Sequence, residues 1–252
     1  MEGQDPLLQE VLRLPAEDGP RLAYAEAIAA SDPDHAALIR LQMDILCGRG
    51  GTYREEQRLL RSVRTRITAS VYPSLIQGFR VSRGFVEGGN VNAQVFVDRA
   101  AELIAKAPVL YLRPTGLPAV AKAFLERPEL RQIRYLDLRL MKIEPTVVEA
   151  LAASPHVREL RWLNLSQNEL PEASLHAIAS SPHLRNLQVL GFSDNVADDP
   201  TPQEIADERG FVHMVVNAPI QQTLADRYGA LKWLKTPFMG VKTLEMRERR
   251  QR

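Results

Sequence analysis

The chain has 252 residues, and 45% of them are hydrophobic, which is enough to build one large domain or two small ones. Its 32 basic and 31 acidic residues give a formal net charge of +1, so no overall field favours nucleic acid or a membrane surface. The single cysteine, Cys47, excludes an internal disulfide. The N-terminus lacks a signal-peptide pattern, and no stretch approaches the ~18 apolar residues of a membrane span. We therefore expect a cytoplasmic protein without membrane contact.

Residues 1–80 are predicted to form a helical module. Apolar residues recur at helical intervals on both sides of a break at DPD, namely Leu22, Ala25, Ile28, Leu38, Leu41 and Ile45. The following TYREEQRLLRSVRTRIT predicts a basic helix in which arginines alternate with Glu55 and Glu56. That alternation is typical of a solvated face, so nucleic-acid binding is not expected. The glycine-rich GRGG at 48–51 lacks the lysine of a phosphate loop and predicts a flexible connection.

A sequence repeat occupies the middle of the chain. The segments IRYLDLRLMKI, LRWLNLSQNEL and LQVLGFSDNVA begin at Ile133, Leu160 and Leu187, so each starts 27 residues after the last. Leucines within each segment alternate at the strand period, whereas the intervening PTVVEALAAS and PEASLHAIAS have helical periodicity. We expect these helices to stop at Ser154 and Ser181, because each serine precedes a proline.

This pattern resembles leucine-rich repeats, and its 27-residue period with helical backs resembles the ribonuclease-inhibitor-like class. The resemblance covers about residues 100–197, including a shortened copy at 110–112. It implies an α/β solenoid of short parallel strands with helical backs, to which we assign residues 81–197. Asn168 and Asn195 follow the strand in two copies, and their side-chain amides are expected to bond the turn. Met141 stands at that position in the first copy, so the turn there must be satisfied differently.

The stretches before the repeats resemble a bacterial repeat-companion domain. They are PRLAYAEAI, DPDHAALIRLQ, RGFVEGG and FVDRAAELIAKAPVLYL. The chain departs from that family at Ala27, where a tryptophan is usual. It also departs at Gly88 and Gly89, where apolar residues usually continue the strand. The family implies no chemical activity.

The repeat period stops at Ala197, and residues 198–252 are expected to cap the open end of the solenoid. ADDPTPQEIADERG is typical of an acidic linker, and FVHMVV predicts a strand. PIQQTLADRYGALKWLK predicts one amphipathic helix through Leu224, Tyr228, Leu231 and Leu234. The last residues, MRERRQR, are expected to be frayed.

The residues between the leucines are expected to line the concave face of the solenoid. The predicted partner-binding residues there are Tyr111, Arg113, Tyr135, Asp137, Arg139, Trp162, Asn164 and Ser166. Tyr135 and Trp162 hold the same repeat position, so they should lie side by side at about the 4.8 Å spacing of strands. Aromatic residues beside arginines are typical of protein-binding hot spots. The alternative is that the N-terminal helices or the tail cover these aromatic side chains.

The sequence shows no pattern of a catalytic, metal or cofactor site. His156 and His183 are repeat-equivalent and are expected to serve the turn, and the other histidines lack ligand partners at suitable spacing. We therefore predict a non-catalytic module that binds another protein as a scaffold or regulator, with no cofactor and no small-molecule ligand. An immunity protein that neutralises a bacterial toxin is an alternative. An enzyme whose site is assembled from unlinked residues is another.

Overall fold

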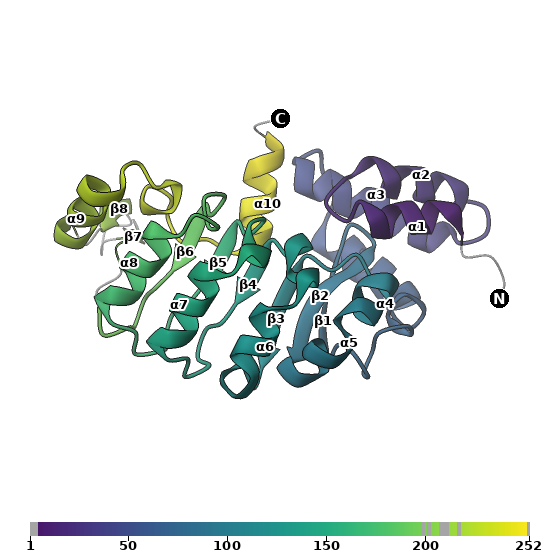
Figure 1. Ribbon diagram of the computed structural model, residues 1–252. Coiled ribbons are helices and arrows are strands. Elements are labelled where there is room, and N and C mark those ends of the chain that lie inside the picture. The colour runs from purple at the N-terminus through teal and green to yellow at the C-terminus, as the bar shows by residue number, and fades with distance from the viewer. Residues whose placement is uncertain (1–4, 198–199, 201–202, 207–211, 216–217, 251–252) are drawn as a thin grey trace. The chain divides into compact units, whose positions relative to one another are not determined.

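The computed structural model describes residues 5–197, 200, 203–206, 212–215 and 218–250. The chain is an α/β protein with a six-stranded sheet of order β1-β2-β3-β4-β5-β6 and a two-stranded sheet of β7 and β8 (Figure 1). It divides into two compact units. Unit 1 comprises Met1–Val91, Arg99–Tyr111 and Gly240–Arg252, and unit 2 comprises Asn92–Asp98 and Leu112–Met239. No helix in the described ranges is both long and apolar enough to cross a membrane.

Unit 1 begins with helices, which confirms the helical character predicted for this part of the chain. They are α1 (Pro6–Arg13), α2 (Gly19–Ala27), α3 (Pro33–Cys47) and α4 (Tyr53–Thr68). Asp5, Asp32 and Thr52 start three of them by accepting hydrogen bonds from backbone N–H groups of the first turn. Helix α3 ends at Gly48, whose φ of 70° lies in the left-handed region that glycine adopts without strain.

Strands β1 (Gly78–Ser82) and β2 (Phe85–Asn92) form an antiparallel hairpin in unit 1. Gly88 on β2 has a φ of 142°, and a Cβ there would lie 1.8 Å from the carbonyl oxygen of Tyr111. Only glycine fits such a close approach of two backbones. A side chain at position 88 would therefore clash with the backbone of Tyr111. Helix α5 (Ala93–Lys106) follows the hairpin and is kinked at Arg99.

Helix α10 (Val241–Arg250) belongs to unit 1 and packs against α3. Its residues Val241, Leu244 and Glu245 are buried. The expectation of a frayed C-terminus is therefore wrong for the described residues up to 250. The contacts that hold α10 come from residues more than 150 positions away, as in the pair of Arg80 with Glu245, so the local sequence gave no sign of them.

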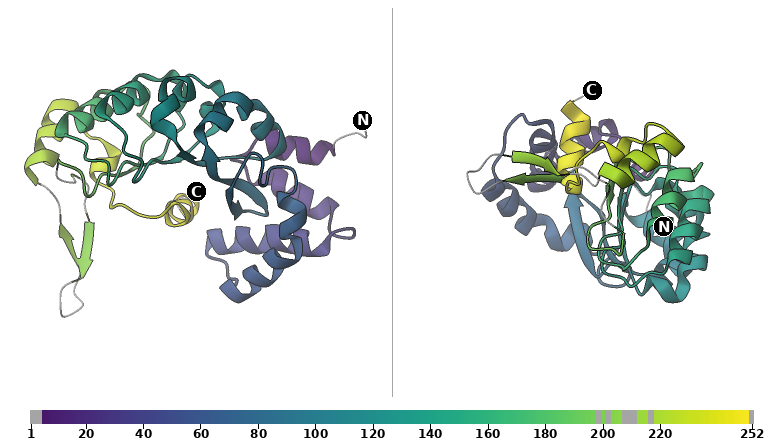
Figure 2. Two further views of the ribbon diagram at one scale, coloured as in Figure 1. Left: turned by 90° about the horizontal axis from the view of Figure 1, so that it is seen from below. Right: turned by 90° about the vertical axis from the view of Figure 1, so that its left-hand side faces the viewer.

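Unit 2 alternates strands and helices. They are β3 (Tyr111–Thr115, of which Tyr111 belongs to unit 1), α6 (Ala121–Leu125), β4 (Tyr135–Asp137), α7 (Pro145–Ala153), β5 (Trp162–Asn164), α8 (Glu172–Ser180) and β6 (Val189–Gly191). Short 3-10 helices at Leu117–Val120, Pro128–Gln132 and Pro155–Val157 complete the connections. Helices α6, α7 and α8 lie side by side along one face of the strands (Figures 1 and 2).

The strands β4, β5 and β6 are parallel and pair in the register predicted from sequence. Tyr135 lies opposite Trp162, which lies opposite Val189. Successive partners in this ladder are 27 residues apart. The leucines between them, such as Leu136 and Leu163, are fully buried and face the helices' side of the unit as core residues.

The ends of α7 and α8 are also confirmed. Both helices stop before a serine, Ser154 or Ser181, whose backbone is extended because a proline follows. Each serine is buried and its hydroxyl donates a hydrogen bond to a backbone carbonyl oxygen, that of Leu125 for Ser154 and that of Ala152 for Ser181. The same polar contact thus ties each helix end to the preceding helix.

The C-terminal part of unit 2 differs from expectation in two places. Strand β8 (Val212–Val215) lies in the predicted FVHMVV, but its antiparallel partner β7 (Gln203–Ala206) lies in the segment expected to be a linker. Helix α9 (Ala218–Tyr228) stops before Gly229, which has a φ of 79°. The prediction of one helix that continues through Leu231 and Leu234 is therefore wrong. A 3-10 helix at Lys232–Leu234 follows and contacts β6.

Candidate functional site

The inner positions of β4 to β6 are covered by the chain itself. Trp162 is 4% exposed and Tyr135 is 3% exposed. The indole N–H of Trp162 donates a hydrogen bond of 2.7 Å to the carbonyl oxygen of Met239, and its ring lies 5.7 Å from the ring of Phe238. The prediction that these two aromatic side chains lie on an open surface is therefore corrected, because both are buried and residues 238–239 of the tail cover Trp162. A partner can reach Trp162 only if residues 238–239 move away.

A glycine in β6 makes room for this covering segment. A Cβ at Gly191 would lie 2.5 Å from Cε2 of Phe238 and 2.6 Å from Oδ1 of Asn164. Gly191 occupies the same position in β6 as Asn164 in β5 and Asp137 in β4. Glycine at position 191 therefore leaves the space that the ring of Phe238 occupies beside β6.

Asp137 and Asn164 shape the turns that follow their strands. Oδ1 of Asp137 accepts a hydrogen bond from the N–H of Arg139, and Oδ1 of Asn164 accepts one from the N–H of Ser166. Both bonds span two residues and are Asx turns. Asp137, Asn164 and Ser166 are all buried, so the prediction that they line an open face is corrected as well.

Asn168 is the polar centre of the next turn. Its side-chain N–H groups donate to the carbonyl oxygens of Leu165 and Leu138, and its Oδ1 accepts from the N–H of Met141. The predicted role of the amide is thereby confirmed. The turn that has Met141 in place of asparagine is satisfied by the asparagine 27 residues further on. Oδ1 of Asn195 likewise accepts a hydrogen bond of 3.0 Å from the backbone N–H of Asn168.

The predicted site residues that remain accessible are arginines. The side chain of Arg113 is 38% exposed and lies 3.9 Å from Oδ2 of Asp137. Arg139 is exposed, and its Nε donates to Oε1 of Gln167 at 2.7 Å. Gln167 in turn donates to Oδ2 of Asp194 at 3.3 Å. Tyr111, in unit 1, is half-buried.

Two large apolar side chains lie exposed in the same turns. Leu140 is 64% exposed and Val196 is 75% exposed. Leu140 also has a φ of 57°, a left-handed conformation that leucine adopts only at a cost. We define the strand-end rim as the exposed residues Arg139, Leu140, Asp194 and Val196 at the carboxyl ends of β4 and β6, together with the half-buried Gln167 after β5. Sequence reasoning did not single out Leu140 or Val196, because their exposure depends on the turn geometry.

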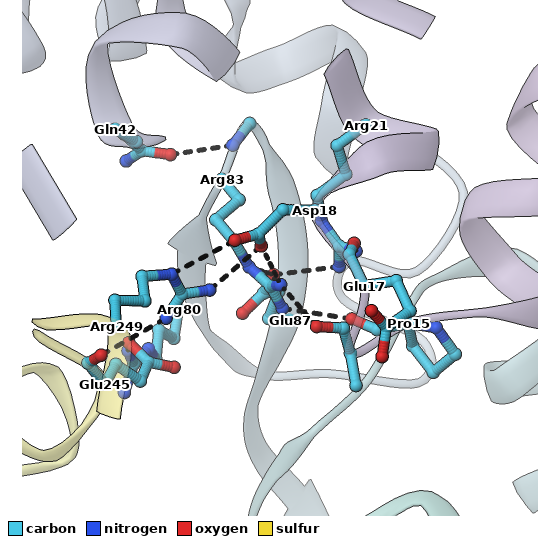
Figure 3. A network of polar contacts seen from close by, with 12 residues as sticks. Pro15, Glu17, Asp18, Arg21, Gln42, Arg80, Arg83, Glu87, Glu245 and Arg249 are labelled. Atoms are coloured by element: carbon cyan, nitrogen blue, oxygen red, sulfur yellow. Dashed lines mark hydrogen bonds and ion pairs between the residues drawn. The ribbon is translucent and has the colours of Figure 1, made fainter. Parts of the chain in front are cut away.

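A second polar cluster lies in unit 1, where α10 meets β1 and the start of α2 (Figure 3). Glu245 of α10 pairs with Arg80 at 2.6 Å. Arg249 of α10 pairs with Asp18 at 3.0 Å. Asp18 also accepts a hydrogen bond of 2.8 Å from Arg83.

Behind these pairs, Glu87 is buried between two arginines. Its Oε1 lies 2.9 Å from Nη2 of Arg21 and 2.6 Å from Nη2 of Arg83. Burial lowers the pKa of Arg21 to about 10, although the Glu87 carboxylate opposes that effect. A buried network of this kind fixes one arrangement of its members, because removing any one of them leaves a partner without its counter-charge.

Two carboxyl groups in this cluster titrate in opposite directions. Burial raises the pKa of Glu245 above its ordinary value, and the nearby guanidinium of Arg80 only partly offsets that rise. Burial acts in the same sense on Asp18, but hydrogen bonds from Arg249 and Arg83 outweigh it and lower the pKa of Asp18. The charge on Asp18 therefore stabilises the cluster, whereas ionisation of Glu245 costs free energy.

No protein-family model, curated protein or solved structure matches this chain.

The two histidines 27 residues apart, His156 and His183, have equivalent contacts. Arg131 Nε lies 3.2 Å from His156 Nδ1, and Arg158 Nε lies 3.4 Å from His183 Nδ1. Among the described residues, no three His, Cys, Asp or Glu side chains lie close enough together to hold a metal ion. The predicted site residues instead pack in the core, bond the turns after the strands, or form the exposed series of hydrogen bonds from Arg139 through Gln167 to Asp194.

Proposed function

We propose that this chain is a non-catalytic protein-binding module, built as a leucine-rich-repeat solenoid behind a helical companion module and acting as a scaffold or regulator. The observation that carries the proposal is the recurrence of the same side-chain contacts every 27 residues. Asn168 bonds the turn at Met141, and Asn195 bonds the turn at Asn168. Stacked units of this kind hold their exposed turn residues on a rigid backbone, which lowers the entropy cost of binding a partner.

The partner is another protein, and the strand-end rim is the surface it contacts. The inner face is a poorer candidate than sequence reasoning expected, because Phe238 and Met239 cover Trp162. The rim combines exposed apolar side chains at Leu140 and Val196 with a ladder of charged and amide groups from Arg139 to Asp194. Apolar anchors with a polar surround are typical of protein interfaces.

The test compares proteins retained from extracts of cells that express the chain. A variant with both Leu140→Asp and Val196→Asp removes the apolar anchors of the rim. Aspartate tolerates the left-handed backbone at 140 better than leucine does, so the fold is expected to persist. Tyr53→Asp is the matched control, because Tyr53 is 76% exposed on α4 in the other unit.

The proposal predicts a protein that the wild type and Tyr53→Asp retain equally and that the rim variant loses. Circular dichroism of all three chains must be the same for the comparison to count. Equal retention by the rim variant contradicts the placement of the binding surface. Retention of no protein by the wild type contradicts the proposed function itself.

A further inference from the structure

Helix α10 presents a narrow, well-defined face to unit 1. Val241, Leu244 and Glu245 are buried, and the side chain of Arg249 is 12% exposed. These positions are i, i+3, i+4 and i+8, which lie on one side of a helix. By contrast Thr243 and Arg247 are exposed on the other side. The helix therefore docks through two apolar side chains followed by one acid and one base.

The surface beneath α10 is complementary to that face in charge. Arg80 of β1 receives Glu245, and Asp18 receives Arg249. We call this surface the α10 seat, which comprises Asp18, Ile45, Leu46, Glu56, Arg80 and Val81. The seat is fixed from behind by the buried pairing of Arg83 with Glu87 at 2.6 Å (Figure 3). It is thus a prearranged helix-binding surface with one cationic and one anionic position.

The internal helix does not fill its seat. A cavity of about 250 Å³ lies beside α10, and its walls include Ile45, Leu46 and Val81. The α10 residue that borders it is Lys242, whose side chain is 53% exposed and lies 3.7 Å from Oε2 of Glu56. The other walls come from Gln42, Glu56, Arg80 and Ser82, so an apolar side chain in place of Lys242 would gain its contacts with Ile45, Leu46 and Val81.

The apolar part of the contact between α10 and the seat is small. The buried apolar residues of α10 are Val241 and Leu244, and on the seat the side chains of Arg80 and Asp18 are 23% and 28% exposed. Burial also disfavours the ionisation of Glu245, the acidic residue that α10 places on the seat. A helix with better complementarity could therefore take its place.

We propose that the α10 seat is a binding site for an amphipathic helix of another protein, and that α10 occupies it as an internal competitor. The partner helix carries two apolar residues three positions apart, an acid directly after the second and a base four positions later. Where α10 has Lys242, it carries a large apolar side chain that enters the cavity. The α10 seat shares no residue with the strand-end rim, so the two proposals can be tested independently.

The test uses labelled peptides of residues 240–252 added to the full chain. The native-sequence peptide must compete with the tethered α10, whose effective concentration is about millimolar, so it binds weakly. A peptide with Lys242→Leu fills the cavity and binds about tenfold more tightly. A peptide with Thr243→Leu adds the same apolar side chain on the outward face and binds like the native sequence. Equal affinity of the two leucine peptides overturns the proposal.

Chain variants separate the seat from its internal ligand. Leu244→Asp in the chain expels α10, so both the native-sequence and the Lys242→Leu peptides gain affinity by about tenfold or more. Arg80→Gln in the chain removes the partner of the peptide's acid and lowers affinity. Arg247→Gln, on the exposed face of α10, leaves peptide binding unchanged. Failure of both peptides to bind the Leu244→Asp chain overturns the proposal.

One measurement does not depend on the expelled state being folded. In the full chain, Lys242→Leu is expected to raise the unfolding temperature by about 2 to 4 °C, because the new side chain fills the cavity. It also weakens peptide binding, since the internal competitor now fits better. Thr243→Leu is the control and is expected to leave both the unfolding temperature and the affinity for the peptide unchanged. A stability gain no larger than that of Thr243→Leu contradicts the proposed use of the cavity.

Discussion

Replacing Asn168 with alanine tests the side-chain bonds that link successive turns. The residue is 6% exposed, and its amide donates to the carbonyl oxygens of Leu138 and Leu165, both at 2.9 Å, while Oδ1 accepts from the N–H of Met141, also at 2.9 Å. Alanine removes the partner of the carbonyl oxygen of Leu138 and of the N–H of Met141, whereas the carbonyl oxygen of Leu165 keeps its hydrogen bond from the amide of Asn195. At about 1 kcal/mol for each lost bond, and more for a group left unsatisfied, the free energy of unfolding should fall by ~3 kcal/mol.

Urea denaturation followed by circular dichroism measures that loss, and Asn186 supplies the control. Asn186 is exposed and donates one bond of 2.8 Å to the carbonyl oxygen of Arg158, so Asn186→Ala should change the free energy of unfolding by no more than ~0.5 kcal/mol. A difference between the two variants of less than ~1 kcal/mol would refute the reasoning. It would mean that water or a shifted backbone satisfies the turn when the amide is gone.

Three further predictions concern the covering segment and the C-terminal helix. Trp162→Ala should lower the free energy of unfolding by ~3–5 kcal/mol in a thermal or urea melt, because the side chain is core and not surface; a loss below ~1 kcal/mol would show that the tail does not cover it. Gly191→Ala should cost ~1–3 kcal/mol through its clash with Phe238, and adding Phe238→Ala should restore part of that loss, whereas an unchanged loss would place the strain elsewhere. The raised pKa of Glu245 means that the folded state holds its proton more tightly than the unfolded state, so this group's contribution to stability is complete below about pH 4.5 and is lost as the pH rises through the folded-state pKa. Glu245→Gln should therefore gain stability relative to wild type between pH 4 and pH 7 in urea melts, and a constant difference across that range would contradict the direction of the shift.

Local periodicity predicted much of unit 2. Because side chains alternate along strands and recur along helices, the leucine spacing located β4, β5 and β6 and their register. The prolines after Ser154 and Ser181 located the ends of α7 and α8. Each of these features depends on residues within one turn or one strand of each other.

The accessibility of the candidate site could not be predicted in the same way. Trp162 is covered by a residue 77 positions later in the chain, through a bond to Met239, and nothing in the periodicity around either residue encodes that contact. The same holds for the network of Arg21 and Glu87, which lie 66 residues apart. Gly191 was the available signal, because a glycine in a strand position otherwise held by polar residues indicates a close approach.

Hydrogen exchange on the chain with and without the protein that it captures tests the central claim most directly. If the strand-end rim is the binding surface, amide protection should rise at residues 139–142, 166–169 and 193–196. The exposed face of α4 should exchange at the same rate in both samples. Protection confined to α4, or to residues 231–239 and the strands beneath them, would contradict the account and return the inner face or the N-terminal helices to consideration.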